Sequence, residues 1–256
     1  MDDKTLWKEF HAFRLYECLG FWIERIIEYP YGTLCLFHPS DDVPYFNRGN
    51  LNLISNERLL SVVEEDTRRF SYDAGFLFSS AWTGDVNKFQ NYIANDKYES
   101  KYKHHWLVKE KFDDIDKIRD SGYRVELTND GESVKRIFNI GFGGDDAFGQ
   151  MVKDKIENNV MPVKTDFYLA YDGDKPIACA GVSYDEKFGY LHCLATLPEY
   201  RGRGVASHLV KARMQFLNGK KIPYAVTCVN VKNDASLAVQ KKFGYRIFET
   251  TDTWKK

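Results

Sequence analysis

The residues that most clearly suggest chemistry form a glycine-containing turn in the second half of the chain. An apolar stretch, Leu191-His192-Cys193-Leu194-Ala195-Thr196, predicts a strand, and Arg201-Gly202-Arg203-Gly204-Val205-Ala206 follows at the start of a predicted helix. The first N–H groups of a helix lack intrahelical partners, and the helix dipole makes that end electropositive. Glycines there let a ligand approach the backbone closely. The pattern predicts a pyrophosphate site, the alternative being an ordinary turn at a helix start.

The elements around this turn predict an α/β domain with helices on both faces of a sheet. Strands are expected at residues 123–127, 167–171, 177–184, 190–196, 224–229 and 245–250, and helices at 131–140, 145–158, 234–243 and along the apolar stripe Val205, Leu209, Ala212 and Phe216. The first half predicts helices at residues 5–19, 57–70 and 86–93, and strands at 33–37, 50–54, 76–78 and 105–108. We place the domains at residues 1–115 and 121–256, with the charged segment 109–120 as the boundary.

Composition narrows the class of protein. A chain of 256 residues suits one large domain or two ordinary ones, and a net charge of −1 argues against a nucleic-acid partner. The five cysteines, an odd number without paired spacing, argue against a disulfide framework and a metal site. The first ten residues do not resemble a secretory signal, and no apolar run approaches a membrane span. We expect a cytoplasmic protein without a membrane partner.

The turn resembles the Arg/Gln-x-x-Gly-x-Gly/Ala motif of the GNAT N-acetyltransferase superfamily, through Arg201, Gly204 and Ala206. Leu-Pro-Glu-Tyr at residues 197–200 is similar to that family's approach to the turn. Asn233-Asp234-Ala235-Ser236 and Phe243-Gly244-Tyr245 resemble its Asn-x-x-Ala/Ser helix and its terminal Gly-aromatic signature. The resemblance covers residues 123–250. It implies the GNAT fold, a mixed and mostly antiparallel central sheet with helices on both faces, and acyl transfer from acetyl-CoA without a metal.

The resemblance also implies three contacts with acetyl-CoA. The strand edge would pair with the pantetheine amides like an added strand, and Asn233, which could instead be a plain helix cap, would bind the pantetheine arm. Backbone N–H groups of the turn would hold the pyrophosphate. The strand-edge residues are Leu194, Ala195 and Thr196, and those of the turn are Arg201, Gly202, Arg203, Gly204, Val205 and Ala206.

His192 is the leading candidate for the base. Acyl transfer to an amine requires a group that accepts the amine proton. His192 lies two residues before Leu194, so both side chains leave the same face of the strand. Its surroundings are similar to the Leu-His-x-Leu-Ala-Val strand of serotonin acetyltransferase, where the histidine belongs to the amine-deprotonating apparatus. The alternative is a hydrogen-bonded histidine inside the sheet.

One position departs from the family pattern. Many GNAT enzymes carry a tyrosine seven residues after the asparagine, where it protonates the thiolate, and here that position holds Gln240. Glutamine donates a hydrogen bond but releases no proton at neutral pH. Gln240 therefore stabilises the thiolate, or another group or water supplies the proton, or the chemistry is weak.

The acceptor pocket is expected at residues 141–149, because the resemblance implies that this loop overhangs the acyl group. Phe142 and Phe148 would form its walls, and Asp145 and Asp146 would attract a cationic amine. A solvated loop with a helix cap at Asp145 is the alternative. The first half, in which residues 54–58 lack a glycine, resembles a degenerate GNAT-like half of a tandem arrangement, the alternative being an unrelated α/β domain.

These features predict an acetyl-CoA-dependent N-acetyltransferase, a monomer or homodimer, that acts on the amine of a small molecule or amino-acid-like acceptor. Metabolite, antibiotic, polyamine and peptide acceptors all fit, as do acetyl and longer acyl donors. The alternatives are a catalytically silent CoA-binding protein and an acetyltransferase acting on a peptide or protein N-terminus. The intact phosphate turn and the near-neutral charge argue against a tandem aminoacyl-transferase that uses charged tRNA.

Overall fold

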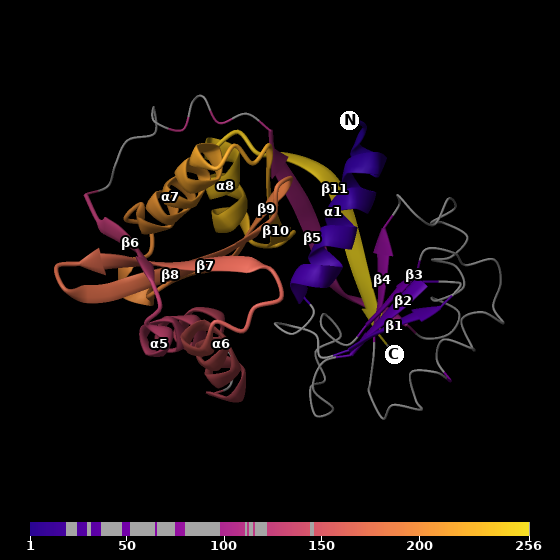
Figure 1. Ribbon diagram of the computed structural model, residues 1–256, viewed down its shortest axis with the longest axis horizontal. Coiled ribbons are helices and arrows are strands. Elements are labelled where there is room, and N and C mark those ends of the chain that lie inside the picture. Colours follow the sequence, from indigo (N-terminus) through magenta and orange to yellow (C-terminus); the bar gives the residue numbers. More distant parts are fainter. Residues whose placement is uncertain are drawn as a thin grey trace. The chain divides into compact units, whose positions relative to one another are not determined.

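The computed structural model describes residues 1–18, 25–29, 32–36, 48–51, 65, 75–79, 98–110, 112, 115, 122–143 and 146–255. The fold is mixed α/β (Figure 1). Contacts divide the chain into two compact units. Unit 1 comprises Met1–Trp106, Val229–Asn233 and Ile247–Lys256, and unit 2 comprises Leu107–Cys228 and Asp234–Arg246. Two short segments from the C-terminal part of the chain, Val229–Asn233 and Ile247–Lys256, therefore belong to unit 1. The division into domains at residues 1–115 and 121–256 stays a prediction.

Unit 2 contains the elements expected for the second half, in the expected order. They are β6 (Arg124–Thr128), α5 (Gly131–Phe142), α6 (Asp146–Asn158), β7 (Lys164–Asp172), β8 (Lys175–Tyr184), β9 (Phe188–Thr196), the short 3-10 helix η2 (Pro198–Tyr200), α7 (Val205–Gly219), β10 (Tyr224–Asn230) and α8 (Asp234–Lys242), with β10 reaching unit 1 at its end. Asp130 caps α5 by accepting a hydrogen bond from the Ser133 N–H, as the sequence predicts.

The sheet of unit 2 is mostly antiparallel. Its strand order is β10-β9-β8-β7-β6, and only the β9–β10 pair is parallel. Figure 1 shows α5 and α6 on one side of β7 and β8 and α7 on the other. Tyr168 and Tyr184 stack edge-on against Phe216 of α7, whereas the neighbouring Phe167 contacts His192. Side chains that alternate along the strands thus point to the two faces of the sheet, each of which is covered by helices. This confirms the predicted architecture.

Unit 1 combines α1 (Asp3–Cys18) with strands in the order β1-β2-β3-β4-β11-β5. These are β1 (Arg25–Tyr29), β2 (Gly32–Leu36), β3 (Arg48–Leu51), β4 (Gly75–Ser79), β5 (Glu99–Lys109) and β11 (Arg246–Lys255). Strand β1 was not expected, since Arg-Ile-Ile-Glu-Tyr lacks period-two alternation. β5 and β11 extend beyond their predicted ranges. Of the predicted helix at residues 57–70 only residue 65 is described, and it is helical, whereas the predicted helix at 86–93 lies outside the described residues.

Aromatic side chains form the core of unit 1. Trp7 and Phe10 of α1 pack on the ring of Trp106, with centroids 5.2 Å and 5.6 Å away, and both also contact Phe248. Trp106 Nε1 donates a hydrogen bond of 2.9 Å to Thr251 Oγ1, which joins β5 to β11. The first helix is therefore anchored by burial of its aromatic face, as its sequence pattern indicates. None of the described helices is long and apolar enough to cross a bilayer.

Replacing Trp7, which is fully buried, tests this anchor. Trp7→Ala should lower the free energy of unfolding by about 3–5 kcal/mol, because the cavity forfeits contacts with the rings of Phe10, His11, Trp106 and Phe248. Urea unfolding followed by circular dichroism measures the change. Lys8→Ala, on the exposed face of the same helix, is the matched control and should stay within about 0.5 kcal/mol of the parent. Equal stabilities for the two variants would contradict the packing described.

Candidate active site

A β-bulge interrupts the pairing of β9 with β8. Cys179 pairs with Ala195 and Gly181 pairs with His192, so one residue of β8 faces two residues of β9, Cys193 and Leu194. Cys193 adopts a φ of 53°, which is uncommon for a residue with a side chain. A bulge bends its strand and re-aims the neighbouring side chains and backbone groups. Strand β9, which is predicted to pair with the pantetheine amides at residues 194–196, is therefore irregular at Cys193, just before that edge.

Beyond the bulge, the edge of β9 that faces β10 is no longer paired with that strand. Register pairs between these parallel strands run from Phe188–Tyr224 to Leu191–Thr227 and end there, although β9 continues to Thr196. Thr227 Oγ1 marks the last tie with a hydrogen bond of 3.0 Å to the Leu191 carbonyl. The N–H and C=O groups of residues 194–196 on that side are free of β10. This is the edge at which the sequence predicts pairing with the pantetheine amides.

The predicted phosphate turn lies directly after β9. Residues 201–204 are exposed, Gly202 and Gly204 have φ values of 76° and 84°, and α7 begins at Val205 without a side-chain cap. The first backbone bond of α7 runs from the His208 N–H to the Gly204 carbonyl, so the N–H groups of residues 205–207 precede it. Uncapped N–H groups at the positive end of a helix, directly after the exposed residues 201–204, suit an anion.

Cationic side chains surround this turn. Arg201 Nε donates to the Thr196 carbonyl at 3.2 Å and folds the turn back on the end of β9. Arg203 and Lys175 both lie over the ring of Tyr200, at 5.4 Å and 5.3 Å from its centroid. The local charge therefore adds to the helix dipole in attracting a phosphate. Lys175, which the sequence pattern did not indicate, also lies 3.4 Å from Glu199 Oε1, so that part of its charge is offset.

The C-terminal end of α5 crosses β9 beside this edge. A Cβ built on Gly141 would lie 2.6 Å from the Cβ of Ala195, so the two backbones approach closely. The next residue, Phe142, is 56% exposed, and its ring lies 4.6 Å from that of Phe138. Phe148 at the start of α6 lies 5.4 Å from the same ring. The two predicted wall residues therefore flank one buried phenylalanine at the α5–α6 junction.

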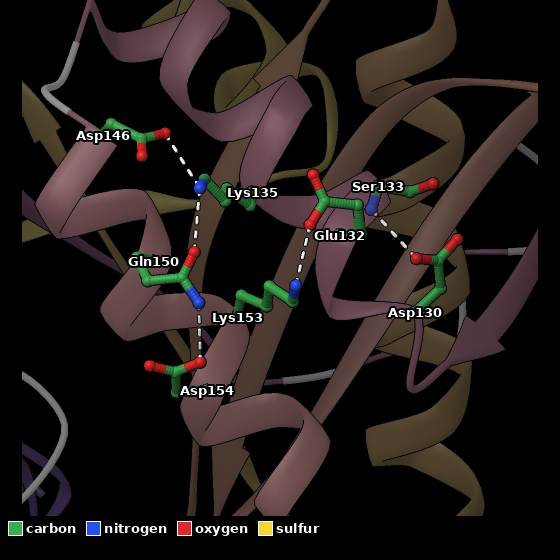
Figure 2. Close-up of polar contacts among 8 residues, drawn as sticks. All are labelled: Asp130, Glu132, Ser133, Lys135, Asp146, Gln150, Lys153 and Asp154. Carbon is green, nitrogen blue, oxygen red and sulfur yellow. Dashed lines mark hydrogen bonds and ion pairs between the residues drawn. The ribbon is translucent and has the colours of Figure 1, made fainter.

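Polar contacts bind α5 to α6 (Figure 2). Lys135 Nζ lies 2.9 Å from both Asp146 Oδ1 and Gln150 Oε1, and Lys153 Nζ lies 2.9 Å from Glu132 Oε2. Exposed pairs contribute about 0–1 kcal/mol each, but only 14% of the Lys135 side chain is accessible. These contacts fix the junction. The ion pair with Lys135 also offsets the charge of Asp146, whose attraction for a cationic acceptor stays a prediction. Asp145 lies outside the described residues.

His192 lies inside the unit, hydrogen-bonded at both ring nitrogens. Nε2 is 2.9 Å from Ser183 Oγ, and Nδ1 is 3.2 Å from Cys193 Sγ. Gly181 makes room for the ring, because a Cβ there would meet His192 Cε1 and Nδ1. The imidazole is 7% exposed and stacks edge-on against Phe167. This geometry is compatible with both interpretations of His192, a hydrogen-bonded histidine inside the sheet and a catalytic base.

Burial sets the protonation state of this group. Desolvation, aided by the positive charge of Arg213, lowers the pKa of His192 to about 3. The ring is therefore neutral at physiological pH. A neutral imidazole can accept a proton during a reaction but cannot keep it for long at this pKa, so a proton that it takes must pass onward.

Arg213 of α7 ties the bulge together and was missed by sequence reasoning. It is 1% exposed, and its Nη1 donates to the carbonyls of Gly181 at 2.8 Å and His192 at 3.2 Å. Its Nε donates to the Leu209 carbonyl one turn earlier. Burial lowers the pKa of Arg213 to about 10, so it stays charged. Its position four residues after Leu209, on the apolar stripe, is the sequence signal that could have identified it.

The other predicted site residues lie on α8 or next to it. Gln240 is 2% exposed, and its side-chain oxygen has no partner among the residues that the structure describes. Asn233 immediately precedes α8, and its N–H donates to the Asn230 carbonyl. Their contacts with CoA stay predictions. No group of three or more His, Cys, Asp or Glu residues that could hold a metal occurs in the described part of the chain.

Comparison with known proteins identifies the class. Residues 136–245 match the model of the Acetyltransferase (GNAT) family, and they contain the bulge, the turn and α8. The chain therefore carries a GNAT domain. No curated protein gave a significant sequence match.

Solved structures share the fold across nearly the whole chain. A functionally unknown conserved protein from Staphylococcus epidermidis superposes with a TM-score of 0.71 at 14% identity, covering 91% of this chain and 94% of that one. A GCN5-related N-acetyltransferase from Kribbella flavida gives 0.68 at 12% identity, covering 95% and 94%. A tandem GNAT protein from the clavulanic acid biosynthesis pathway gives 0.62 at 13% identity, covering 88% and 78%. At these identities the likeness shows the fold alone, and that fold includes the N-terminal part.

The depressed pKa of His192 predicts acid-sensitive stability. In the unfolded chain the ring titrates near its ordinary value of about 6.5, so protons favour the unfolded state as pH falls from there toward 3. Across about pH 6 to 4 this single group should remove about 1.4 kcal/mol of stability per pH unit. His192→Gln should lack that contribution. Urea unfolding of both proteins across this range measures the difference, and parallel pH profiles would contradict the buried neutral ring.

Proposed function

We propose that this protein transfers the acetyl group of acetyl-CoA to the amine of a small-molecule or amino-acid-like acceptor. The observation that carries the proposal is the uncapped N-terminus of α7, with exposed glycines at positive φ directly after the open edge of β9. A GNAT domain implies acetyl transfer from acetyl-CoA. The local geometry offers the anion site and the strand edge that such a donor requires.

The donor would lie along β9 and end at the turn. Its pyrophosphate would accept hydrogen bonds from backbone N–H groups of residues 201–206, with Arg201 and Arg203 adding charge. Its pantetheine amides would pair with Leu194, Ala195 and Thr196, and Asn233 would bind the same arm. The thioester would then reach the bulge, where N–H groups re-aimed by the irregular backbone would stabilise the acyl oxyanion.

Proton transfer would involve His192. The attacking amine must lose a proton as its nitrogen bonds to the acyl carbon, and the neutral imidazole can accept it directly or through water. The CoA thiolate leaves at the same time and must be stabilised. Gln240 offers a side-chain amide, which can donate a hydrogen bond to sulfur but not a proton. The proton taken up by His192 can supply the thiolate, since a ring with so low a pKa releases it readily.

The acceptor would bind at the α5–α6 junction. Gly141 against Ala195 brings this junction over β9, and Phe142 presents an exposed aromatic face there. Phe148 lies on the other side of Phe138. An apolar wall with a carboxylate nearby suits an organic amine. Asp145 and Asp146 would supply that negative charge, Asp146 in competition with Lys135.

The activity is tested by measuring thiol release from acetyl-CoA with a panel of amines, amino acids, aminoglycosides, polyamines and short peptides. Amine-dependent release is expected, and the responding class names the acceptor. A CoA-binding protein without activity is the second candidate, favoured by Gln240 in place of a tyrosine. It predicts a thermal shift with acetyl-CoA but no release with any amine. Absence of both signals would overturn both proposals.

Two glycines with similar positive φ values test the phosphate turn. Gly202 and Gly122 have φ values of 76° and 83°, and an added Cβ would meet no atom within 4 Å at either site. Alanine should strain both positions by about 1–2 kcal/mol. Only Gly202→Ala should weaken acetyl-CoA binding, by about tenfold, a change of about 1.4 kcal/mol. Isothermal titration calorimetry of acetyl-CoA binding measures the Kd of each variant. An equal effect of Gly122→Ala would contradict the proposal that the turn binds the pyrophosphate.

A further inference from the structure

The ring of Tyr200, at the end of η2, is surrounded by charged side chains from separate segments of unit 2. Arg203 of the turn and Lys175 of the β7–β8 hairpin lie over it, with their charged groups 5.4 Å and 5.3 Å from its centroid. The Tyr200 hydroxyl donates a hydrogen bond to Asp172, on the other strand of that hairpin. These contacts connect the turn that follows β9 with the hairpin that precedes it.

Positive charge exceeds negative charge around this ring. Arg136 of α5 interacts electrostatically with Glu199, which also lies 3.4 Å from Lys175 Nζ. Arg201 follows Tyr200 directly and folds back onto the last carbonyl of β9. Among the described residues, this Tyr200 cluster thus brings together four cations and two carboxylates, namely Arg136, Lys175, Arg201, Arg203, Asp172 and Glu199. The excess of positive charge favours an anion.

The cations of the Tyr200 cluster are accessible to a ligand. The Lys175 side chain is 53% accessible, and residues 201–204 are exposed. Because Lys175 and Arg203 carry like charges and are held at one ring, they repel each other, and an anion that contacts both relieves this repulsion. The cluster therefore offers an exposed, positively charged site made of side chains, beside the backbone N–H groups that open α7.

A phosphate monoester matches the chemistry of this site. It carries a charge of about −1.5 to −2 at pH 7 and three acceptor oxygens. A guanidinium such as that of Arg203 can bind two of these oxygens at once, and the ammonium of Lys175 adds a point charge. The backbone N–H groups at the start of α7 are a separate set of donors, so the two sets can hold different phosphates of one ligand. CoA carries both kinds, a pyrophosphate and a monoester on the 3′-oxygen of its ribose.

We propose that the Tyr200 cluster binds the 3′-phosphate of CoA, and that the protein thereby selects a nucleotide-bearing thioester as its acyl donor. The inference rests on the proposed function, which assigns the pyrophosphate of the same ligand to the turn. A pantetheine thioester attached to an acyl carrier protein lacks the 3′-phosphate and would bind without this contact. Recognition of the 3′-phosphate thus distinguishes a free CoA donor from a carrier-bound one.

Comparing acetyl-CoA with acetyl-dephospho-CoA, which lacks only the 3′-phosphate, tests the proposal. Isothermal titration calorimetry of the wild-type protein should give a Kd about tenfold lower for acetyl-CoA, because the charge-assisted contacts with the 3′-phosphate are absent from the second ligand. Lys175→Gln should weaken acetyl-CoA binding about threefold to fivefold, as expected for one exposed charge pair. The same variant should leave the Kd of acetyl-dephospho-CoA unchanged.

Lys187→Gln is the matched control. Lys187 also lies over an aromatic ring, with its Nζ 5.7 Å from the centroid of Phe188, but it belongs to the turn at the opposite end of β8. The substitution removes the same charge from the protein. It should therefore leave both Kd values within about twofold of the wild-type values, which separates a local contact from the effect of net charge.

Nucleotides without an acyl arm examine the site independently of acetyl transfer. Adenosine 3′,5′-bisphosphate should displace acetyl-CoA at a concentration about fivefold lower than adenosine 5′-monophosphate, and Lys175→Gln should reduce that difference. Equal Kd values of acetyl-CoA and acetyl-dephospho-CoA in the wild type would overturn this inference and leave the proposed function standing. An equal loss of both ligands in Lys175→Gln would also overturn it. Binding of neither ligand to the wild type would overturn the proposed function as well.

Discussion

The bulge in β9, held by the buried guanidinium of Arg213, is the constraint on which the rest of the site depends. Arg213 donates to carbonyls on both strands at the bulge, those of Gly181 and His192. The buried charge costs desolvation energy, which its carbonyl partners offset. Because those carbonyls accept from Arg213, the irregular backbone is stabilised from the α7 side of the sheet. Cys193 can then adopt its uncommon φ, and His192 is aimed back at its own neighbour.

The position of that bulge in the sheet determines where the proposed acetyl-CoA site lies. Pairing with β10 ends just before it, so the following three residues of β9 offer an unpaired edge. The strand then runs through η2 into the turn that opens α7. A single continuous segment, residues 188–207, therefore carries the proposed base, the strand edge and the uncapped helix N-terminus. Helix α7 contributes twice, with its N-terminus at the turn and Arg213 at the bulge.

The acceptor side has a different physical basis. Helices α5 and α6 are joined by ion pairs of modest strength and by an aromatic group around Phe138, not by strand pairing. Such a junction can change between related proteins without disturbing the sheet, which fits a fold that serves many acceptors. The proposed donor site, by contrast, would be built from backbone groups whose positions the sheet fixes. If the acceptor binds there as proposed, a few side chains at the junction would decide its identity.

The sequence by itself determined the order of elements in unit 2, the cap at Asp130, the glycine turn before Val205 and the place of His192 on a buried strand. Each of these is local, written in periodicity, turn residues or spacing within one segment. Only the tertiary structure decided the bulge at Cys193, the carbonyls bound by Arg213, the Ser183 partner of His192 and the Lys135–Asp146 pair. These depend on strand register and on contacts between distant segments, and an extra residue in one strand leaves no mark in period-two alternation.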